Sequence, residues 1–336
     1  MEIQKNVTIE RYVSPLPQLE EAAPTAIQLR PSRFNDYPGQ KHAKENLKIF
    51  VAAAKKRGRP LDHVILHGPP GLGKTTLAHI IANELEVPFH STSGPSLDKP
   101  GDLAGILAGL EPSALLFIDE IHRLPIQVEE VLYSAMENFA IDVIVGQGPT
   151  ARSVTIPVSP FTLVGATTRL SSLSRPFLSR FGIQEKLDFY EVEALEEILV
   201  RGAGLLGIQL GSSGAHELAV CSRGTPRVAL RLLRRVWDFA EVLHAGLIDD
   251  EVVREGLLRL DIDSKGLDRM DRDILSMVHT RYQGGPVGIE ALAITLGEER
   301  STIEEVYEPF LVYCGYLSRS PRGRMLTEKG IAYLQA

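Results

Sequence analysis

Four short apolar runs alternate with segments of helical periodicity over the first half of the chain. The runs are Val64–Leu66, Phe89–Thr92, Ala114–Ile118 and Phe161–Thr167. Between them, apolar residues recur every three or four positions, which is the spacing of one helix face. Short apolar strands separated by helices are typical of a parallel sheet that helices cover on both faces. We therefore predict a doubly wound α/β domain from Gln40 to about Phe189.

One stretch interrupts this alternation before the last apolar run. Residues 141–145 and 154–158 alternate between apolar and polar positions, and the glycine-containing residues 146–153 join them. This pattern predicts a β-hairpin. Either its apolar residues pack on the sheet, or the hairpin projects and offers Ile144 or Val145 to a partner protein.

From Glu191 to about Leu260 the signals are all helical. Gly224, Thr225 and Pro226 mark a boundary, because glycine ends one helix, threonine caps the next and proline suits its first turn. The helix that follows is predicted to bury an apolar stripe and to leave its arginines solvated. The stripe comprises Val228, Leu232, Leu233, Val236, Phe239 and Leu243, and the arginines are Arg231, Arg234 and Arg235.

After a linker over residues 261–268, the pattern predicts a winged-helix domain. Three helical segments near residues 269–281, 288–295 and 298–313 precede a hairpin around Pro321. The third helix carries Glu298, Glu299, Glu304, Glu305 and Glu308, and the hairpin carries Arg319, Arg322 and Arg324. Carboxylates repel phosphates, so we expect the hairpin, or wing, to contact DNA phosphates rather than the third helix. The alternative is that the wing is a solvated turn.

The bulk composition limits the class of protein. A length of 336 residues suggests two or three domains, and a net charge of −7 argues against a broad basic nucleic-acid-binding face. Cys221 and Cys314 lie in apolar helical patterns, which favours buried free thiols in a reducing compartment. No secretory or membrane-spanning pattern is present, so we expect a cytoplasmic location without membrane contact. Residues 1–28 lack periodicity and predict a flexible tail.

The strongest chemical signal is a glycine-rich loop between an apolar run and a helical pattern. Gly68, Gly73, Lys74 and Thr75 match the phosphate-binding loop G-x-x-x-x-G-K-[ST]. Its backbone N–H groups and the helix N-terminus cradle polyphosphate. Lys74 is expected to reach the β and γ phosphates, and the Thr75 hydroxyl to ligate Mg²⁺. A chance glycine-rich turn is the alternative, and the flanking strand and helix patterns weigh against it.

Other strand ends supply the remaining parts of a hydrolytic site. The run 115–118 ends in Asp119 and Glu120, and strand ends of a doubly wound sheet face the ligand. Asp119 is expected to hold Mg²⁺, and Glu120 to act as general base toward the attacking water. A hydroxyl at residues 167–168 is placed to orient that water. Arg180 has no carboxylate partner nearby in the sequence and is expected to stabilise transition-state charge.

Several motifs together resemble a known family. The phosphate-binding loop with Phe117–Arg123, Gly165–Arg169, Arg180–Gly182 and Gly224–Arg227 resembles AAA+ ATPases. More narrowly, the chain is similar to the RuvB family, the bacterial motors that drive branch migration of Holliday junctions. The motifs that carry this similarity are Thr92–Pro95, Val145–Ser153, Gly284–Gly288, Gly297–Arg300 and Pro321–Arg324.

The resemblance implies a domain plan. It consists of a tail over residues 1–28, a large AAA+ ATPase domain over 29–190, a small helical lid over 191–261 and a winged-helix head over 262–336. It also implies a homohexamer that hydrolyses ATP with Mg²⁺ and translocates double-stranded DNA at a Holliday junction. RuvA would be its partner at the hairpin, and RuvC would join in the resolving complex.

The same resemblance implies roles for individual residues. Thr168 matches sensor 1, Arg227 matches sensor 2, and Arg180 matches an arginine finger that acts on the neighbouring subunit's ATP. Lys74 and Glu120 join Arg180 as catalytic residues. The implied nucleotide contacts are Leu29, Arg30, Gly71, Gly73, Lys74, Thr75, Thr76, Asp119, Glu137, Asn138, Phe139, Thr168, Arg180, Tyr190 and Arg227. The implied DNA contacts are Arg300, Arg319, Arg322 and Arg324.

Two other functions share the nucleotide site. A protein remodeller or clamp-loader-like ATPase has the same core, but it has no need of a winged helix with a basic wing. A nucleotide-dependent switch would bind ATP with negligible turnover, and Glu120 argues against it.

Overall fold

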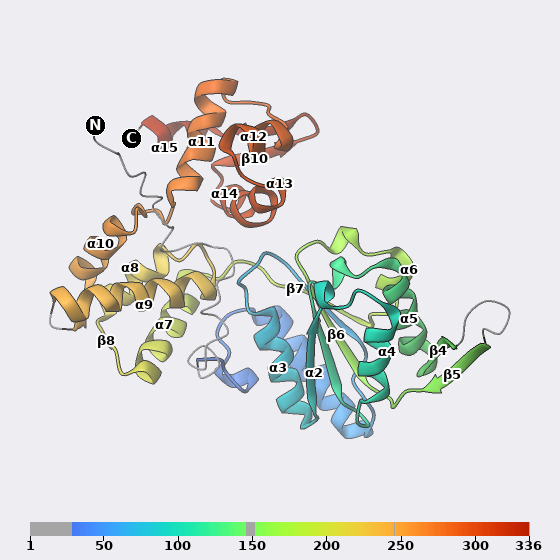
Figure 1. Ribbon diagram of the computed structural model, residues 1–336. Coiled ribbons are helices and arrows are strands. Elements are labelled where there is room, and N and C mark those ends of the chain that lie inside the picture. Colours follow the sequence, from blue (N-terminus) through green and yellow to red (C-terminus); the bar gives the residue numbers. More distant parts are fainter. Residues whose placement is uncertain (1–28, 146–151, 245, 336) are drawn as a thin grey trace, which may run out of the picture. The chain divides into compact units, whose positions relative to one another are not determined.

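The computed structural model describes residues 29–145, 152–244 and 246–335. They form two compact units (Figure 1). The first spans Arg30–Asp188, and the second combines Leu29 with the residues from Phe189 onward. The predicted tail over residues 1–28 and the hairpin tip over 146–151 lie outside the described residues.

The first unit is built on a five-stranded parallel sheet of order β2-β3-β6-β1-β7. Its strands are β1 (Val64–His67), β2 (Phe89–Ser93), β3 (Leu115–Asp119), β6 (Thr162–Thr167) and β7 (Ile183–Lys186). The four predicted strands are confirmed. The fifth strand, β7, was not predicted. Among the described strands it pairs with β1 alone, at the sheet edge, and its residues alternate between buried and exposed. An edge strand of this kind does not produce a continuous apolar run.

Helices cover both faces of this sheet, as the sequence predicts (Figure 1). The longer helices are α2 (Lys41–Arg57), α3 (Lys74–Leu85), α4 (Pro100–Ala108) and α5 (Ile126–Asn138), and α6 (Arg175–Leu178) is short. Single 3₁₀ turns occur at Phe34–Asp36, Gly94–Ser96, Ile121–Arg123 and Leu170–Ser172. On one face, residues of α4 and α5 such as Leu103 and Leu132 join Leu116 of β3 in a fully buried core.

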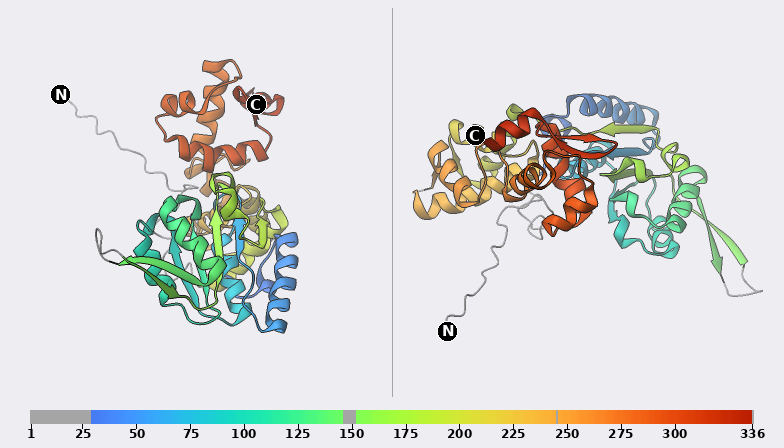
Figure 2. Two further views of the ribbon diagram at one scale, coloured as in Figure 1. Left: turned by 90° about the vertical axis from the view of Figure 1, so that its right-hand side faces the viewer. Right: turned by 90° about the horizontal axis from the view of Figure 1, so that it is seen from above.

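The predicted hairpin consists of β4 (Ala140–Val145) and β5 (Arg152–Pro157), which pair antiparallel and separately from the main sheet. Its base packs into the core through Ile141 and Val158, while its strands extend away from the body of the first unit (Figure 2). Each of the two alternatives therefore describes one part of the hairpin. The backbone pairs Ile144 with Ser153 and Val145 with Arg152, and a partner contact at these positions stays a prediction.

The second unit begins with a helical lid. Its helices are α7 (Val192–Leu206), α8 (Ser212–Val220), α9 (Pro226–Leu243) and α10 (Asp250–Arg259). Thr225 caps α9 by accepting a hydrogen bond from the Val228 N–H, which confirms the predicted boundary. The all-helical prediction is wrong in one respect, because β8 (Gln209–Leu210) and β9 (Leu247–Ile248) form a two-residue parallel pair.

Two predictions about α9 are also wrong. Arg231 is buried, with 7% of its surface exposed, because it lies three residues after Val228 and so shares the packed face. Leu243 is 49% exposed, because it is the last residue of the helix and the core does not cover it.

The C-terminal part has the predicted winged-helix arrangement. It contains α11 (Arg269–Tyr282), α12 (Ile289–Leu296), α13 (Arg300–Thr302), a π turn (Ile303–Tyr307), α14 (Glu308–Tyr313), β10 (Leu317–Ser320), β11 (Gly323–Leu326) and α15 (Glu328–Gln335). The π turn precedes Pro309, which lacks the N–H that a regular helix requires. Helix α15 was not predicted. No helix among the described residues is long and apolar enough to cross a membrane.

Candidate functional site

The phosphate-binding loop joins β1 to α3 and needs glycine at its bends. Gly68 and Gly73 have φ angles of +143° and +89°, a region that favours glycine. A Cβ on Gly68 would lie 2.3 Å from the Leu187 carbonyl oxygen. The loop is therefore tightly set against the chain that follows β7, and substitution of Gly68 would displace it.

Lys74 lies in the first turn of α3 with its side chain folded over the loop. Its Nζ donates hydrogen bonds of 2.8 Å to the carbonyl oxygens of Gly68 and Pro69. The ammonium is thus held over the bend at the N-terminus of α3, where phosphate binds in loops of this kind. Thr75 and Thr76 follow it in the same turn and are half-buried.

Strand order brings the phosphate-binding loop, Asp119 and Thr167 to one edge of the sheet. Strand β6 lies between β1 and β3, so its last residue, Thr167, separates the loop from the acidic pair. Because all of these strands are parallel, their carboxyl ends face the same side. The expectation that these strand ends converge is confirmed.

The acidic pair ends β3 with a sharp turn. Glu120 has a left-handed backbone, with φ of +47°, and its N–H donates to Asp119 Oδ1 at 2.9 Å. The two carboxylates have different partners. Glu120 forms a 3.0 Å ion pair with Arg123, a residue that the sequence analysis did not assign.

A hydrogen-bonded bridge joins the acidic turn to the end of β6. The Thr167 hydroxyl lies 3.0 Å from His122 Nδ1 and accepts a hydrogen bond from the Arg169 N–H at 2.9 Å. His122 lies within the motif Phe117–Arg123, but sequence reasoning assigned it no role in the site. Its position two residues after Glu120 was the available signal, because it places the ring beside the neighbouring strand end. Thr168, the predicted sensor, follows directly and is half-buried.

The residues present fit a magnesium ion that is held largely by phosphate. Among the described residues no three His, Cys, Asp or Glu side chains gather in a way that would hold a metal ion. Mg²⁺ characteristically takes one or two protein oxygens together with water and substrate phosphates. The Thr75 hydroxyl and the Asp119 carboxylate, at one sheet edge, are oxygen donors of that kind.

Arg180 lies after α6 and is bound within the first unit. Its guanidinium donates to the Tyr133 hydroxyl and, at 2.9 Å, to Glu137 Oε2, and it lies 4.5 Å from the centroid of the Tyr133 ring. The Tyr133 hydrogen bond, and then the Glu137 charge, raise the pKa of Arg180. Sequence reasoning missed this partner because 43 residues separate Arg180 from Glu137.

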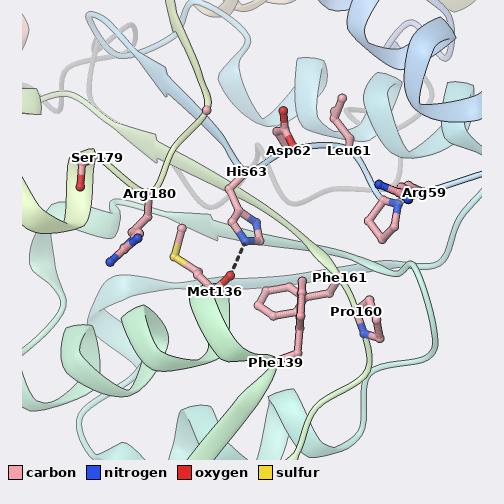
Figure 3. A pocket seen from close by; sticks show the side chains of 12 residues that line it. Arg59, Leu61, Asp62, His63, Met136, Phe139, Pro160, Phe161, Ser179 and Arg180 are labelled. Atoms are coloured by element: carbon pink, nitrogen blue, oxygen red, sulfur yellow. Dashed lines mark hydrogen bonds between the residues drawn. The ribbon is translucent and has the colours of Figure 1, made fainter. Parts of the chain in front are cut away.

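A cavity of about 560 Å³ opens beside Arg180. Figure 3 shows Arg180 and Ser179 on one side of it and Phe139 and Phe161 on another. The structure therefore brings Glu137, Arg180 and Phe139 to one region of the first unit. Asn138, between Glu137 and Phe139, is exposed.

Residues 30–37, which include Arg30 and Arg33 and precede α2, pack closely against the rest of the first unit. Phe34 and Tyr37 are each 3% exposed. The Tyr37 hydroxyl donates to the carbonyl oxygen of Leu72 at 3.4 Å, and the Phe34 N–H donates to Glu84 Oε1 at 3.2 Å. The segment that contains Arg30 is thus attached to the phosphate-binding loop and to the end of α3.

Three predicted nucleotide contacts belong to the second unit. Leu29 is buried, and its carbonyl oxygen accepts a hydrogen bond from Arg201 at 3.0 Å. Tyr190 is buried, and its N–H donates to the Gly224 carbonyl oxygen at 2.9 Å. Arg227 is half-buried in the first turn of α9. Leu29 and Tyr190 are thus tied to lid elements, and Tyr190 lies beside the turn that leads to Arg227.

The wing arginines are paired with acids of the preceding helix. Glu308 is 1% exposed. It accepts bidentate hydrogen bonds from Arg319, at 2.7 and 2.8 Å, and from Arg324, at 2.9 and 3.1 Å. Arg324 also reaches Glu304 at 3.3 Å. Glu304 and Glu308 thus hold the wing in place, a role that the sequence pattern does not reveal.

The four predicted DNA contacts differ in exposure. The side chains of Arg319 and Arg300 are 52% and 56% exposed, whereas that of Arg324 is only 14% exposed. Arg300 pairs with Glu290 at 2.6 Å and Glu304 at 3.4 Å. Arg322 is exposed, and its guanidinium makes no ion pair among the described residues.

The two cysteines are free thiols, as predicted. Cys221 is buried and Cys314 is half-buried. Burial raises the pKa of Cys221 to about 12 and that of Cys314 to about 11.

Comparison with known proteins matches nearly the whole chain. The models described as the Holliday junction DNA helicase RuvB P-loop domain, the RuvB AAA lid domain and the RuvB C-terminal winged helix domain match residues 29–187, 190–263 and 264–335. The Holliday junction branch migration complex subunit RuvB of Rubrobacter xylanophilus is 52% identical over 325 residues, which are 97% of this chain and 91% of that protein.

Solved structures of a RuvB protein are similar to this chain over nearly its whole length. The Thermotoga maritima RuvB Holliday junction branch migration motor has a TM-score of 0.85 and 50% identity, over 92% of this chain and 98% of that chain. A single-residue variant of the same protein has a TM-score of 0.84 and 50% identity, over 91% and 98%. On these matches, together with the P-loop, lid and winged-helix architecture, the chain belongs to the RuvB family of P-loop ATPases.

Proposed function

We propose that this protein is an ATP-driven DNA motor that moves Holliday junctions as a homohexameric ring working with RuvA. The observation that carries the proposal is the convergence of Lys74, Asp119 and Thr167 at one edge of the sheet. The family to which the chain belongs supports it. A DNA motor works where the DNA is, so we place it in the cytoplasm.

In this proposal the nucleotide site divides its tasks. The loop glycines, among them Gly71 and Gly73, with Lys74 and Thr76 bind the phosphates, and Glu120 takes the proton of the attacking water. Mg²⁺, held by Thr75 and Asp119, would neutralise charge on the phosphates. One oxygen of the Glu120 carboxylate, Oε2, forms the 3.0 Å ion pair with Arg123.

The remaining nucleotide residues report between subunits and domains. Arg180 acts on the neighbouring subunit's ATP, with Glu137, Asn138 and Phe139 beside it. Thr168 serves as sensor 1 and Arg227 as sensor 2. Leu29, Arg30 and Tyr190 line the nucleotide.

The other domains provide the substrate and partner surfaces. We assign residues 29–190 to the ATPase domain, 191–261 to the lid and 262–336 to the head. Four arginines contact DNA phosphates and do not recognise the base sequence. They are Arg300, Arg319, Arg322 and Arg324. The β4–β5 hairpin docks on RuvA through Ile144 or Val145, and RuvC joins when junctions are resolved.

The test is dissociation of a synthetic four-way junction with ATP, with and without RuvA, by the wild type and by Glu120→Gln. We expect movement that requires ATP, Glu120 and RuvA, while Glu120→Gln still binds ATP. Loss of a general base lowers the rate by about 10²–10⁴-fold. ATP hydrolysis without any junction movement would contradict the motor and favour a protein remodeller. Tight binding of ATP without turnover by the wild type would favour a switch.

A mixing experiment tests the action of Arg180 in trans. Arg180→Ala alone is expected to bind ATP but to lose hydrolysis by about 10³–10⁵-fold. Glu120→Gln subunits carry an intact Arg180, so mixing the two inactive variants is expected to restore part of the hydrolysis. Normal hydrolysis by Arg180→Ala alone would refute the assignment.

A further inference from the structure

A buried ion pair joins the lid to the head within the second unit. Arg223 lies in the turn between α8 and α9, and Asp271 lies in the first turn of α11. Their side chains are 5% and 0% exposed and are hydrogen-bonded to each other. Asp268, which caps α11, lies 3.9 Å from the same guanidinium.

The Arg223 guanidinium also contacts the third helix of the head. It lies 4.5 Å from the centroid of the Phe310 ring and 5.6 Å from that of Tyr307, distances at which a cation is attracted to a ring face. It donates to the Val306 carbonyl oxygen at 3.5 Å. A single lid residue is thus held by two separate helices of the winged-helix domain, one of which bears the acids that hold the wing.

The backbone around Arg223 connects this contact to the nucleotide-sensing side of the lid. Arg223 and Gly224 both have left-handed backbones, with φ of +55° and +63°, so they form a tight turn. The Gly224 carbonyl oxygen accepts the Tyr190 N–H. A Cβ on Gly224 would lie 2.9 Å from the Phe189 side chain. Thr225 then caps α9, whose second residue is Arg227.

Aromatic rings extend the contact on the other side of the turn. The Phe189 ring lies 4.6 Å from Tyr313 and 6.3 Å from Phe310, centroid to centroid. The turn therefore packs against Phe189, which in turn packs on Phe310 and Tyr313 of α14 in the head. The turn, the start of α9 and the head are in contact through one small cluster.

The charges make this arrangement specific. Moving a buried charge away from its partner is costly, so the two side chains hold the head in one position relative to the turn. Burial would lower the pKa of Arg223, but Asp271 and Asp268 raise it, which keeps the guanidinium charged.

We propose that the Arg223–Asp271 pair transmits movement of the lid to the DNA-binding head. The movement would begin at the turn that leads to Arg227, the proposed sensor 2. Arg223 is in this view a positioning residue, since its side chain contacts Asp271, Val306 and Phe310 of the head. The inference rests on the proposed motor function. It adds the contact that couples nucleotide sensing in the lid to DNA binding by the head.

The test compares Arg223→Met, Asp271→Asn and the double variant Arg223→Met/Asp271→Leu with the wild type. Arg254→Met is the matched control, because Arg254 forms an exposed ion pair with Glu217 in the same lid. Two quantities are measured in the full-length protein. One is junction dissociation per ATP hydrolysed, and the other is the distance distribution between spin labels at Ser213→Cys and Thr280→Cys, with the native cysteines replaced by alanine.

We expect the single variants to lower junction movement per ATP by at least about fivefold while ATP hydrolysis without DNA persists, and to broaden the distance distribution. The control is expected to match the wild type. The double variant is expected to regain thermal stability yet remain uncoupled, because the packing returns without the charges. If coupling returned with stability, the pair would be ordinary packing and the proposal would be wrong.

Unchanged coupling and an unchanged distance distribution in the single variants would equally overturn it. Failure of the motor function itself is distinguishable. In that case the wild type moves no junction, while the label distances still report whether the pair holds the head to the lid.

Discussion

At the scale of single residues, His63 shows how an uncharged ring holds two backbone segments together. Its Nδ1 accepts the Leu163 N–H at 2.9 Å, and its Nε2 faces the Met136 carbonyl oxygen at 3.4 Å (Figure 3). Only the neutral tautomer with the proton on Nε2 satisfies both contacts. Burial lowers the pKa of His63, and it also lowers those of His67 and His79.

We therefore predict that the protein loses stability as the pH falls through the unfolded histidine pKa of about 6.5. The unfolded chain binds more protons than the folded one in that range, so the free energy of unfolding rises with pH. Urea unfolding at pH 7.5, 6.5 and 5.5 measures the slope. His63→Gln, which cannot be protonated, is expected to show a shallower slope, and an identical slope would contradict the account of this ring.

The thiols give a second prediction at this scale. The raised pKa values of Cys221, to about 12, and of Cys314, to about 11, leave almost no thiolate at pH 8. A thiol-specific chromogenic reagent is expected to react slowly with the native protein and fully in denaturant. Rapid reaction of two thiols in the native state would show that the C-terminal domains open.

At the scale of elements, the wing is held by the helix that precedes it. Glu308 is almost fully buried and receives both Arg319 and Arg324. The sequence places acids on one element and arginines on the next, but it does not reveal that they meet. The two arginines therefore differ in role. Arg324 is largely buried and holds the wing to Glu308, whereas Arg322 is exposed.

The prediction is a contrast between two alanine variants of the wing. Arg324→Ala leaves part of a buried carboxylate unpaired and is expected to destabilise the head by about 1–3 kcal/mol. Arg322→Ala is expected to leave thermal stability unchanged, to weaken binding to duplex DNA and to lower the salt dependence by about one phosphate contact. Thermal unfolding and DNA titrations at several salt concentrations separate the two effects. Equal loss of stability in both variants would contradict this division.

At the scale of the whole molecule, the β4–β5 hairpin forms a sheet of its own, separate from the main sheet of its unit. Among the described residues its two strands pair only with each other, and Ile141 and Val158 anchor its base. An apolar partner contact farther out along the strands would leave the nucleotide site intact.

We predict that Ile144→Asp or Val145→Asp abolishes stimulation of junction movement by RuvA while ATP hydrolysis without RuvA stays near the wild-type rate. Asp142→Asn, at an exposed position on the same strand, serves as the control. Pull-down with RuvA and junction assays measure the outcome. Normal RuvA binding by both aspartate variants would place the docking surface elsewhere.

Local pattern alone determined a large part of this protein. The strands before Gly68 and Glu120, the cap at Thr225 and the winged-helix order all follow from periodicity and turn chemistry, which act over a few neighbouring residues. The phosphate-binding loop is equally local, because its chemistry needs glycine, lysine and threonine at a set spacing. These features did not require any knowledge of distant contacts.

Only the tertiary structure decided which distant groups meet. Arg180 with Glu137, Arg324 with Glu308 and Arg223 with Asp271 are joined across 43, 16 and 48 residues. No local preference encodes such pairs. The residues near a charged side chain in the sequence do not show whether the folded protein buries it or leaves it in water. The edge strand β7 escaped prediction for the same reason, because burial depends on what packs against an element rather than on its own sequence.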